Sequence, residues 1–469
     1  MRTHLDRRVA GARTRLALLA AACLLLAATP AAAAAKHKAK RKPPPQLALT
    51  PGLTSGPGVA IARSPVGLSI EYPLIAAYLG SAACPPPALE AELLRLGSPQ
   101  LALEGQSQDF TMPAGLTPSG PAPSWEAVTR YPLPSEFWTR LHCLLSVTKE
   151  PLTVGLNARD GQLAWAESMV AGAQQAATAR LDFSIGNEPD HYYLPNYLSL
   201  TKQQPGEEAK TVFDYLQVAG YLRQAVGPLP LIGPELAIPA DWRASLPRVL
   251  ATLHPQTVGV HAYPLTVCRS LREATIHGLL APSIGGEPRR LAWVAADARA
   301  AGLPAVISEA NSVSCGGKVG VSDAPASAVW AVRFVLAALE SGFGEVRFHM
   351  SGNSYDPFYM NGAEVVRRPL EGAMLALQQW LRVGSTLRSL RPIGKVTLAS
   401  IAAPGAEPLL LLDNEAAKPA KLLLRGAGAL RVVQSFSPTG ATGTVTPQGA
   451  GRRLVTLPAN TLLALRFAP

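Results

Sequence analysis

Short apolar runs of strand length alternate with longer segments of helical spacing between residues 66 and 384. The longer segments, among them 213–226, 326–342 and 370–383, carry apolar residues three and four positions apart, and Gly342 can end the second of them. The eight apolar runs span residues 66–72, 100–105, 151–157, 181–187, 229–234, 257–263, 303–309 and 345–350. Eight strand–helix units predict an α/β fold, a (β/α)8 TIM barrel over residues 66–384. A doubly wound open sheet would also alternate, but no glycine-rich phosphate loop follows the first run.

The pattern changes after residue 384, where short apolar or alternating segments are separated by Gly, Pro, Asn and Asp. These segments span residues 395–402, 409–413, 421–426, 430–436, 452–458 and 461–467. They predict a C-terminal antiparallel β-sandwich over residues 385–469. Because this region is short for a sandwich, we expect a further strand from the segment before the barrel (36–65), where LALTP or GVAIA (47–61) could supply it.

Positive charge is concentrated at the N-terminus. Residues 1–42 hold 10 Lys and Arg and one acidic residue, whereas the rest of the chain holds 33 basic and 31 acidic residues. The formal net charge of +11 therefore does not indicate a nucleic-acid partner for the main body. The basic, proline-rich run KHKAKRKPPPQ (36–46) is typical of an extended linker and could contact an anionic cell surface.

Residues 1–35 have the pattern of a secretory signal peptide. Five arginines lie within the first 15 residues, a 13-residue apolar run follows at 16–28, and the small residues of TPAAAAA offer cleavage sites. The apolar run is shorter than the roughly 20 residues that a membrane span needs. We therefore expect a secreted protein, extracellular or associated with the cell surface.

The cysteines fit that compartment. Removal of the signal peptide would take Cys23 and leave Cys84, Cys143, Cys268 and Cys315. An even number in an oxidising compartment permits two disulfides, with three possible pairings. The cysteines lack zinc-ligand spacing, and the eight histidines form no HExxH motif, so we expect neither a metal nor another cofactor.

Two acidic residues end strands on opposite sides of the predicted barrel. The fourth strand ends in Asn187-Glu188-Pro189-Asp190 and the seventh ends in Glu309, whereas the third ends in Asn157, a further candidate for substrate binding. Active sites of such barrels lie at the C-terminal ends of the strands. A lone Glu there is more often a cap or an ion-pair partner. Two opposed carboxylates without a nucleotide or metal motif fit glycoside hydrolysis.

The residues around both carboxylates resemble known enzymes. SIGNEPDHY and VISEANSVSCGG are similar to the acid/base and nucleophile signatures of retaining glycosidases of clan A. GLSIEYP, LLRLGSPQLALEGQSQD, VGVHAYPL and EANSVSCGGKVGVSD together resemble glycoside hydrolase family 79, the heparanase and β-glucuronidase family. The resemblance extends over nearly the whole mature chain, and the family's β-sandwich, built mainly from the C-terminus with N-terminal help, fits residues 385–469.

The resemblance implies catalytic roles and a geometry. Glu188 would be the acid/base and Glu309 the nucleophile, with Asn187 binding the sugar 2-hydroxyl and Tyr263 donating a hydrogen bond to the nucleophile. The two carboxyl groups of a retaining enzyme lie about 5–5.5 Å apart. Glu188 should have a raised pKa so that it carries a proton near neutral pH, while Glu309 stays ionised.

The resemblance also implies sugar contacts. Glu71 matches an acidic position that contacts sugar hydroxyls, and Gly316 and Gly317 resemble a turn whose backbone N–H groups receive a uronate carboxylate. Two residues depart from the family pattern: Glu104 replaces a glycine on the second strand, and Cys315 replaces a tyrosine before the Gly-Gly turn.

The barrel order also suggests how the cysteines pair. Cys268 follows the sixth strand and Cys315 the seventh, so their loops should be neighbours, which leaves Cys84 to pair with Cys143.

These expectations together describe a secreted, monomeric β-glucuronidase that acts on a glucuronide or another uronate-containing glycan. The alternatives are another clan A exo-glycosidase, namely a β-xylosidase, β-galactosidase or arabinofuranosidase, or an inactive carbohydrate-binding relative.

Overall fold

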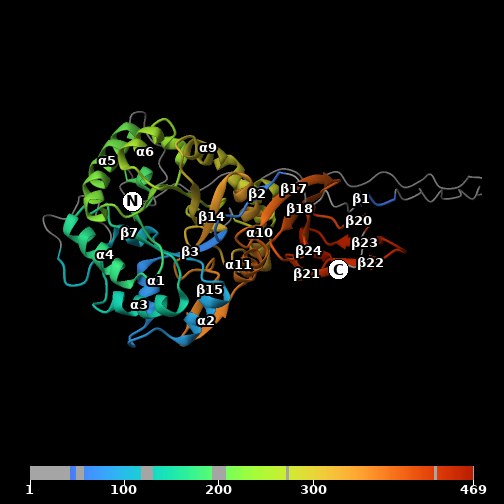
Figure 1. Ribbon diagram of the computed structural model, residues 1–469, viewed down its shortest axis with the longest axis horizontal. Coiled ribbons are helices and arrows are strands. Elements are labelled where there is room, and N and C mark those ends of the chain that lie inside the picture. Colours follow the sequence, from blue (N-terminus) through green and yellow to red (C-terminus); the bar gives the residue numbers. More distant parts are fainter. Residues whose placement is uncertain are drawn as a thin grey trace, which may run out of the picture. The chain divides into compact units, whose positions relative to one another are not determined.

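Eight parallel strands close into a barrel in the computed structural model of the chain (Figure 1). Each of the eight segments that the sequence predicts as barrel strands is one of them, and the chain runs around the barrel in sequence order before β14 pairs with β3. The barrel strands are β3 (Val66–Ile70), β4 (Gln100–Leu103), β7 (Leu152–Leu156), β8 (Leu181–Ile185), β9 (Leu231–Leu236), β10 (Thr257–Ala262), β12 (Ala305–Ala310) and β14 (Phe343–Met350). The predicted (β/α)8 barrel is therefore confirmed.

The structure describes residues 43–48, 57–117, 130–192, 207–270, 274–426 and 430–467. The expected signal peptide (1–35) and the basic residues 36–42 lie outside these ranges, as does the LALTP end of the predicted N-terminal strand beyond residue 48.

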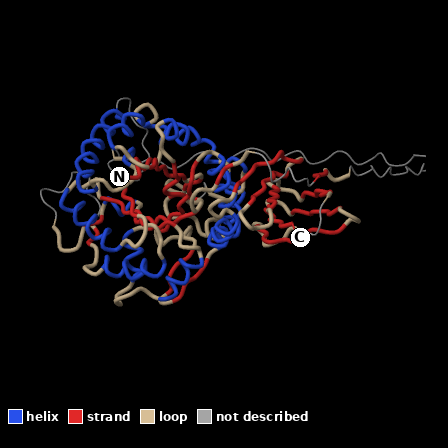
Figure 2. The backbone as a smooth tube through the Cα atoms, viewed as in Figure 1, coloured by secondary structure: helices blue, strands red, loops and turns tan. Residues whose placement is uncertain are grey.

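Helices surround the ring of strands, as Figure 2 shows. They are α1 (Tyr72–Leu79), α2 (Pro87–Arg95), α3 (Phe137–Thr148), α4 (Leu163–Ala176), α5 (Glu207–Val226), α6 (Leu246–Leu253), α7 (Ile276–Leu279), α8 (Pro282–Gly285), α9 (Ala292–Ala300), α10 (Pro325–Glu340) and α11 (Pro369–Trp380). Short 3₁₀ helices are η2 (Gln106–Asp109), η3 (Pro189–His191), η4 (Pro239–Trp242) and η5 (Glu287–Leu291). None of the helices within the described ranges is long and apolar enough to cross a bilayer.

Two further sheets form a sandwich from the C-terminal part of the chain. The six-stranded sheet has the order β2-β17-β18-β19-β24-β21 and the four-stranded sheet the order β1-β20-β23-β22. Their strands are β1 (Gln46–Ala48), β2 (Val59–Ala60), β17 (Thr386–Ile393), β18 (Val396–Ala402), β19 (Leu409–Asn414), β20 (Ala420–Arg425), β21 (Leu430–Phe436), β22 (Thr444–Pro447), β23 (Arg452–Leu457) and β24 (Thr461–Phe467). The two strands that precede the barrel therefore complete sheets built by the last residues.

Four small strands pair in the loops, namely β5 (Thr111–Met112) with β6 (Tyr131–Pro132) and β11 (Leu265–Thr266) with β13 (Val313–Ser314). A hairpin of β15 (Phe358–Asn361) and β16 (Glu364–Arg367) follows the last barrel strand.

Strand β19, at the centre of the six-stranded sheet, is buried on both faces. In β19, Leu410 and Leu412 belong to the core between the two sheets, whereas Leu409 and Leu411 belong to the core shared with the barrel helices. Successive side chains of a strand point to opposite faces, so burial of both explains the unbroken apolar run in this strand.

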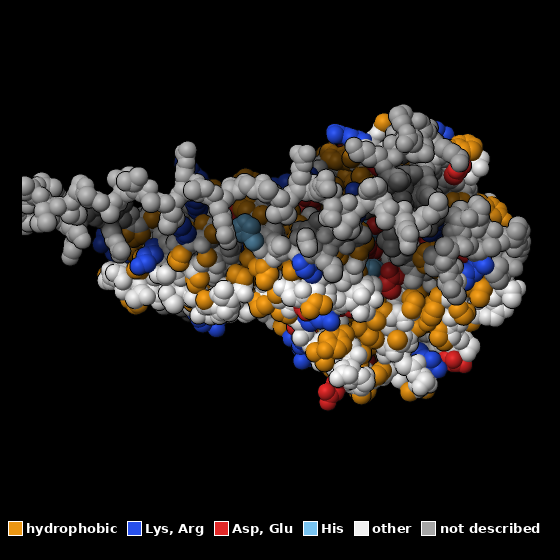
Figure 3. Space-filling view, turned by 180° about the vertical axis from the view of Figure 1, so that it is seen from behind, with side chains coloured by type: hydrophobic (Ala, Val, Ile, Leu, Met, Phe, Trp, Pro, Cys, Tyr) orange, Lys and Arg blue, Asp and Glu red, His pale blue; other side chains and the backbone are white. Residues whose placement is uncertain are grey.

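A buried ion pair joins the barrel to this sheet. Arg333 of α10 donates two hydrogen bonds to the Asp413 carboxylate of β19, at 2.8 and 2.7 Å, beside a cavity of about 280 Å³. Arg333 and Asp413, two of the charged groups of this cavity wall, therefore neutralise each other. On the face shown in Figure 3, the visible Lys and Arg side chains are scattered among hydrophobic and uncharged ones.

Candidate active site

A cavity of about 590 Å³ opens at the C-terminal ends of the barrel strands. This volume lies in the range of small-molecule sites. Its walls include three glutamates and three histidines but no Lys or Arg among the described residues. These six residues are Glu71, Glu188, Glu309, His191, His261 and His349. A ligand in this cavity therefore meets groups that exchange protons rather than permanent cations.

The two predicted catalytic glutamates lie close together in this cavity. One carboxylate oxygen of Glu188, one of Glu309 and a ring nitrogen of His261 lie within 4.8 Å of one another. This spacing is near the roughly 5–5.5 Å of retaining glycosidases and well short of the roughly 6.5–9.5 Å of inverting ones. The same three side chains could also hold a metal ion, although a metal ligand must first lose the proton that His261 shares with Glu188.

Local backbone geometry aims Glu188 into the cavity. Gly186 directly follows β8 and has a φ of 75°, and Glu188 itself has a φ of 48° in the left-handed region. Residues other than glycine, asparagine and aspartate rarely adopt this backbone conformation, so contacts with neighbouring residues must hold Glu188 in it. Glu309 needs no such turn, because it lies within strand β12, in register with His261 of β10.

Two histidines contact the Glu188 carboxylate. His261 Nδ1 lies 3.0 Å from Oε1 and His191 Nδ1 lies 3.3 Å from Oε2. Burial acts to lower the pKa of both histidines, but the Glu309 and Glu188 carboxylates raise that of His261 to about 10, and Glu188 raises that of His191 to about 9.

The predicted raised pKa of Glu188 is wrong. Burial alone would raise it, but the hydrogen bonds and charges of His191 and His261 outweigh burial, and the pKa of Glu188 lies below its ordinary value. The proton expected on Glu188 is therefore held by its histidine partners. His191 follows Glu188 by three residues in η3, whereas His261 comes from β10 and was not indicated as a partner by the sequence.

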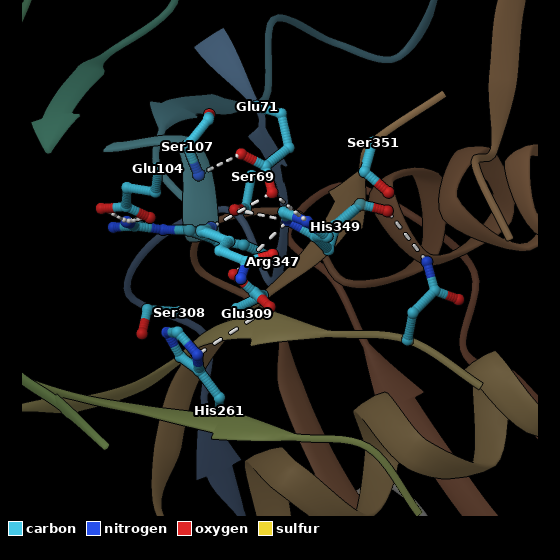
Figure 4. A network of polar contacts seen from close by, with 12 residues as sticks. Ser69, Glu71, Glu104, Ser107, His261, Ser308, Glu309, Arg347, His349 and Ser351 are labelled. Atoms are coloured by element: carbon cyan, nitrogen blue, oxygen red, sulfur yellow. Dashed lines mark hydrogen bonds and ion pairs between the residues drawn. The ribbon is translucent and has the colours of Figure 1, made fainter. Parts of the chain in front are cut away.

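The Tyr263 hydroxyl donates a hydrogen bond to Glu309 Oε1 at 2.7 Å, as predicted. Burial and the Glu309 charge raise the pKa of Tyr263 well above its ordinary value, so it remains a donor. On the other side, His349 Nδ1 lies 3.5 Å from Glu309 Oε2. Glu309 therefore lies between the Tyr263 phenol and the His349 imidazole, and Figure 4 shows its position beside His349.

Glu71 lines the cavity at the end of β3. Its two oxygens accept the backbone N–H groups of Gln106 (3.1 Å) and Ser107 (2.7 Å), and His349 Nε2 lies 3.4 Å away (Figure 4). A Cβ on Gly105 would lie only 2.5 Å from His349 and 2.8 Å from Glu71, so this position needs glycine. The loop after β4 thereby fixes a carboxylate at the cavity wall.

The Gly-Gly turn reaches the cavity only in part. Gly316 lines the wall, whereas Gly317 lies behind it, close to Ser354 and Ser322. Both glycines have positive φ values, 86° and 77°. The next side chain, Lys318, turns away and donates its ammonium to the Ala274 carbonyl at 2.7 Å.

Two disulfides are present, Cys84–Cys143 and Cys268–Cys315, the pairs expected from the barrel order. The second lines the cavity, and the pairing of β11 with β13 ties the same two loops together. Thr266 and Ser314, which also line the wall, are joined by a 2.8 Å hydrogen bond between their hydroxyls. The loop that carries Gly316 is therefore fastened on one side to the loop after β10.

The two asparagines behave differently. Asn187 lines the cavity beside Glu188, whereas Asn157 is not part of the cavity wall. The Asn157 amide donates to Asp160 at 2.9 Å and accepts the Asp160 N–H at 2.8 Å. The expected substrate contact of Asn157 is thus corrected: its side chain closes a turn after β7.

Glu104, the acidic departure on the second strand, lies inside the barrel and not at the cavity wall. Arg347 Nη1 donates to both of its oxygens at 3.3 Å, and Arg347 Nε donates to Glu345 at 3.0 Å (Figure 4). Burial next to Glu235 raises the pKa of Glu104 to about 8. The Glu104 carboxyl group is therefore paired with Arg347 in the barrel interior and does not line the cavity.

Several cavity residues had no role assigned from the sequence, chiefly His261 and the polar side chains of Ser351 and Asn353. His261 had a usable signal, because it lies two positions before Tyr263 and alternation places both on the same face of the strand. Ser351 and Asn353 follow the last barrel strand in a polar segment without such a pattern.

The fold is similar to those of solved glycoside hydrolases. A 4-O-α-L-rhamnosyl-β-D-glucuronidase from Fusarium oxysporum 12S aligns with a TM-score of 0.66 at 18% identity, over 88% of this chain and 98% of that one. The family 51 α-L-arabinofuranosidase AbfB from Bifidobacterium longum aligns with a TM-score of 0.59 at 15% identity, over 90% and 99% of the two chains.

The catalytic domain of the family 30 xylanase C from Talaromyces cellulolyticus aligns with a TM-score of 0.53 at 11% identity, over 88% and 98%. No protein-family model matches the sequence, and no curated protein matches it significantly. At these identities the likeness establishes the fold, a (β/α)8 barrel with added antiparallel sheets.

Proposed function

We propose that the chain is a retaining glycoside hydrolase in which Glu188 is the acid/base and Glu309 the nucleophile. The observation that carries this proposal is the approach of the two carboxylates to within 4.8 Å at the mouth of the barrel. In the first step a Glu309 oxygen attacks the anomeric carbon while the bond from that carbon to the leaving oxygen breaks, and the leaving oxygen takes a proton from Glu188. In the second step water attacks the same carbon, Glu188 takes the proton of that water, and Glu309 departs as a carboxylate.

The proton for the first step is shared between Glu188 and His261. Their contact of 3.0 Å is short enough for the proton to pass from Nδ1 to the carboxylate as charge develops on the leaving oxygen. Coupling of this kind lets Glu188 act as an acid despite its lowered pKa, because the pair carries the proton as a unit. The Tyr263 hydroxyl keeps Glu309 oriented without protonating it.

We further propose that the sugar is a β-glucuronide and that the chain is a relative of family 79. The cavity offers a uronate carboxylate the N–H group of Gly316, beside Asn353 and Ser351. Backbone amides can bind an anion without a lysine. The rhamnosyl-glucuronidase with the same fold supports a uronide over the pentosides of the other two neighbours. Secretion also belongs to this proposal and is supported by the two disulfides.

The test is parallel release of nitrophenol from β-glucuronide, β-glucoside, β-galactoside, β-xyloside and α-arabinofuranoside. A neutral hexose has no carboxylate for the donors around Gly316, and each donor left unpaired weakens binding by about 1–3 kcal/mol. We expect kcat/KM for the glucuronide to exceed that for the glucoside by about 5- to 150-fold. Equal or faster cleavage of the glucoside would overturn the uronide, while no turnover of any glycoside together with calorimetric sugar binding would favour an inactive binding protein.

A matched pair of glycine variants locates the uronate contact. In Gly316→Ala the new Cβ would lie 3.1 Å from the Asn353 side chain, at a backbone φ that alanine disfavours. Gly362→Ala places a Cβ at a similarly positive φ in the β15–β16 turn, with nothing within 4 Å. We expect Gly316→Ala to lower the ratio of glucuronide to glucoside cleavage and Gly362→Ala to leave that ratio unchanged.

A further inference from the structure

Asp109 is a buried carboxylate on which three loops at the mouth of the barrel converge. It ends η2 after β4 and is 1% exposed. Its Oδ1 accepts the N–H of Ala158, after β7, at 3.1 Å. Its Oδ2 accepts the N–H of Asn187, after β8, at 3.1 Å and the hydroxyl of Tyr192 at 2.8 Å. The residue does not line the cavity, so it would not touch a sugar there.

These contacts bracket Glu188. Asn187 precedes it and Tyr192 lies four residues after it, so Asp109 holds both ends of the segment that carries the carboxylate. The N–H of Glu188 itself donates to the Glu235 carbonyl at 3.0 Å. A left-handed backbone at a residue other than glycine costs about 1–3 kcal/mol and persists only where its surroundings hold it.

The two acceptor oxygens of Asp109 suit this task. Burial raises its pKa to about 7, while Arg159 and the Tyr192, Asn187 and Ala158 donors act in the opposite direction. The Arg159 guanidinium lies 5.6 Å from the ring centres of both Tyr192 and Phe110, which places a cation beside the carboxylate. An ionised carboxylate accepts hydrogen bonds more strongly than a neutral amide does.

We infer that Asp109 is a positioning residue for the acid/base: it fixes the backbone on both sides of Glu188 and thereby aims that carboxylate at the leaving oxygen. This inference rests on the proposed function. It assigns a role in the reaction to a residue 79 positions before the catalytic glutamate and outside the Asn-Glu-Pro segment.

Leaving-group dependence separates positioning from mere stability. Acid catalysis matters for a poor leaving group such as phenol and hardly at all for 2,4-dinitrophenol, whose anion departs unaided. For Asp109→Asn we expect kcat/KM to fall about 10²-fold with the phenyl glycoside, since a small misplacement of a catalytic group can cost that much. The fall with the 2,4-dinitrophenyl glycoside of the same sugar should stay under about 5-fold, because that substrate needs no acid catalyst.

Asp160→Asn is the matched control. Asp160 is also a largely buried carboxylate in the loop after β7, but its side chain bonds to Arg130 and Asn157, outside the segment 187–192. Its replacement should change both substrates by the same factor. Tyr192→Phe removes one of the three donors to Asp109. It should change the ratio of kcat/KM for the phenyl and dinitrophenyl glycosides in the same direction as Asp109→Asn, but by less. This variant replaces Asp109→Asn in the test if Asp109→Asn does not fold.

The crystal structure of Asp109→Asn provides a measurement that needs no activity. We expect residues 186–192 to shift and Glu188 to leave its left-handed conformation, whereas Asp160→Asn should leave both in place. With an active wild-type enzyme, an unchanged leaving-group ratio overturns the inference. If the wild type cleaves no glycoside, the proposed function fails, and the position of residues 186–192 alone decides whether Asp109 holds the segment.

Discussion

Two clusters of buried charge lie one above the other in the barrel, and they are built differently. At the mouth, Glu188 and Glu309 face a cavity and are contacted by the histidines His191, His261 and His349. In the interior, Arg347 pairs with Glu104 and Glu345, away from the cavity wall.

The difference lies in the type of cation. An arginine keeps its proton at every accessible pH, so the cation of the interior cluster is permanent and has no proton to exchange. A histidine can release its proton, so the mouth cluster can exchange one with a bound molecule. The comparison teaches that partner type and access to a cavity, rather than burial of a carboxylate alone, mark the carboxylates that can perform chemistry.

The largest expected effect is a loss of turnover when a carboxylate of the mouth cluster is removed but not when one of the interior cluster is. Glu309→Gln removes the nucleophile and should lower turnover by more than about 10³-fold, while sugar binding persists. Glu104→Gln, the control from the interior, should keep turnover within a few-fold of the wild type. Both are measured by nitrophenol release and isothermal titration. Wild-type turnover in Glu309→Gln would show that the nucleophile is another residue.

The second effect concerns stability. Arg347→Met leaves Glu104 and Glu345 buried without their cation, and we expect the free energy of unfolding to fall by about 3–5 kcal/mol. Urea unfolding followed by circular dichroism measures it. A loss below about 1 kcal/mol would mean that the interior cluster contributes little, and the contrast drawn above would fail.

The smallest expected effect is a pH dependence of the free energy of unfolding, caused by His349 of the mouth cluster. Neighbouring Glu309 and Glu71 outweigh burial and raise the pKa of His349 to about 9. The folded protein therefore holds this proton more tightly than the unfolded chain, whose histidines titrate near 6.5. The resulting stability is complete below about pH 6.5 and is lost as the pH rises through about 9, an effect of about 1–3 kcal/mol.

Melting temperatures of the wild type and of His349→Gln, recorded from pH 6 to 10, check this expectation. The difference between the two proteins should shrink as the pH rises. A constant difference across that range would mean that His349 contributes packing and not charge. The mouth cluster would then respond to pH no more than Arg347, which does not titrate in this range.

The barrel was predictable because burial on both faces leaves unbroken apolar runs, and the polar residue that ends each run marks the mouth. The β15–β16 hairpin was missed, because its two strands have only four residues each and are only partly buried. Within the site, the location of Glu188 and Glu309 at the cavity was predictable from their positions at strand ends.

The pKa of Glu188 was not predictable. It depends on His191, three residues later in the chain, and also on His261, which is 73 residues away and reaches the carboxylate only through the curvature of the barrel. The partner of Glu104 was not predictable either. The sequence gives no sign that Arg347, 243 residues later, pairs with this acidic residue. Pairings across the barrel decide these properties, and a linear pattern does not contain them.

The pairing of first and last strands has a consequence for the order of folding. Strand β1 takes its place beside β20, and β2 beside β17, so the earliest described residues reach their partners only after nearly the whole chain has been made. Contacts between such distant residues form slowly, because a long loop must close first. A nascent chain can assemble barrel units as they emerge, but the sheet edges at β17 and β20 stay open until the N-terminal segment returns, and during that interval they are exposed to other chains.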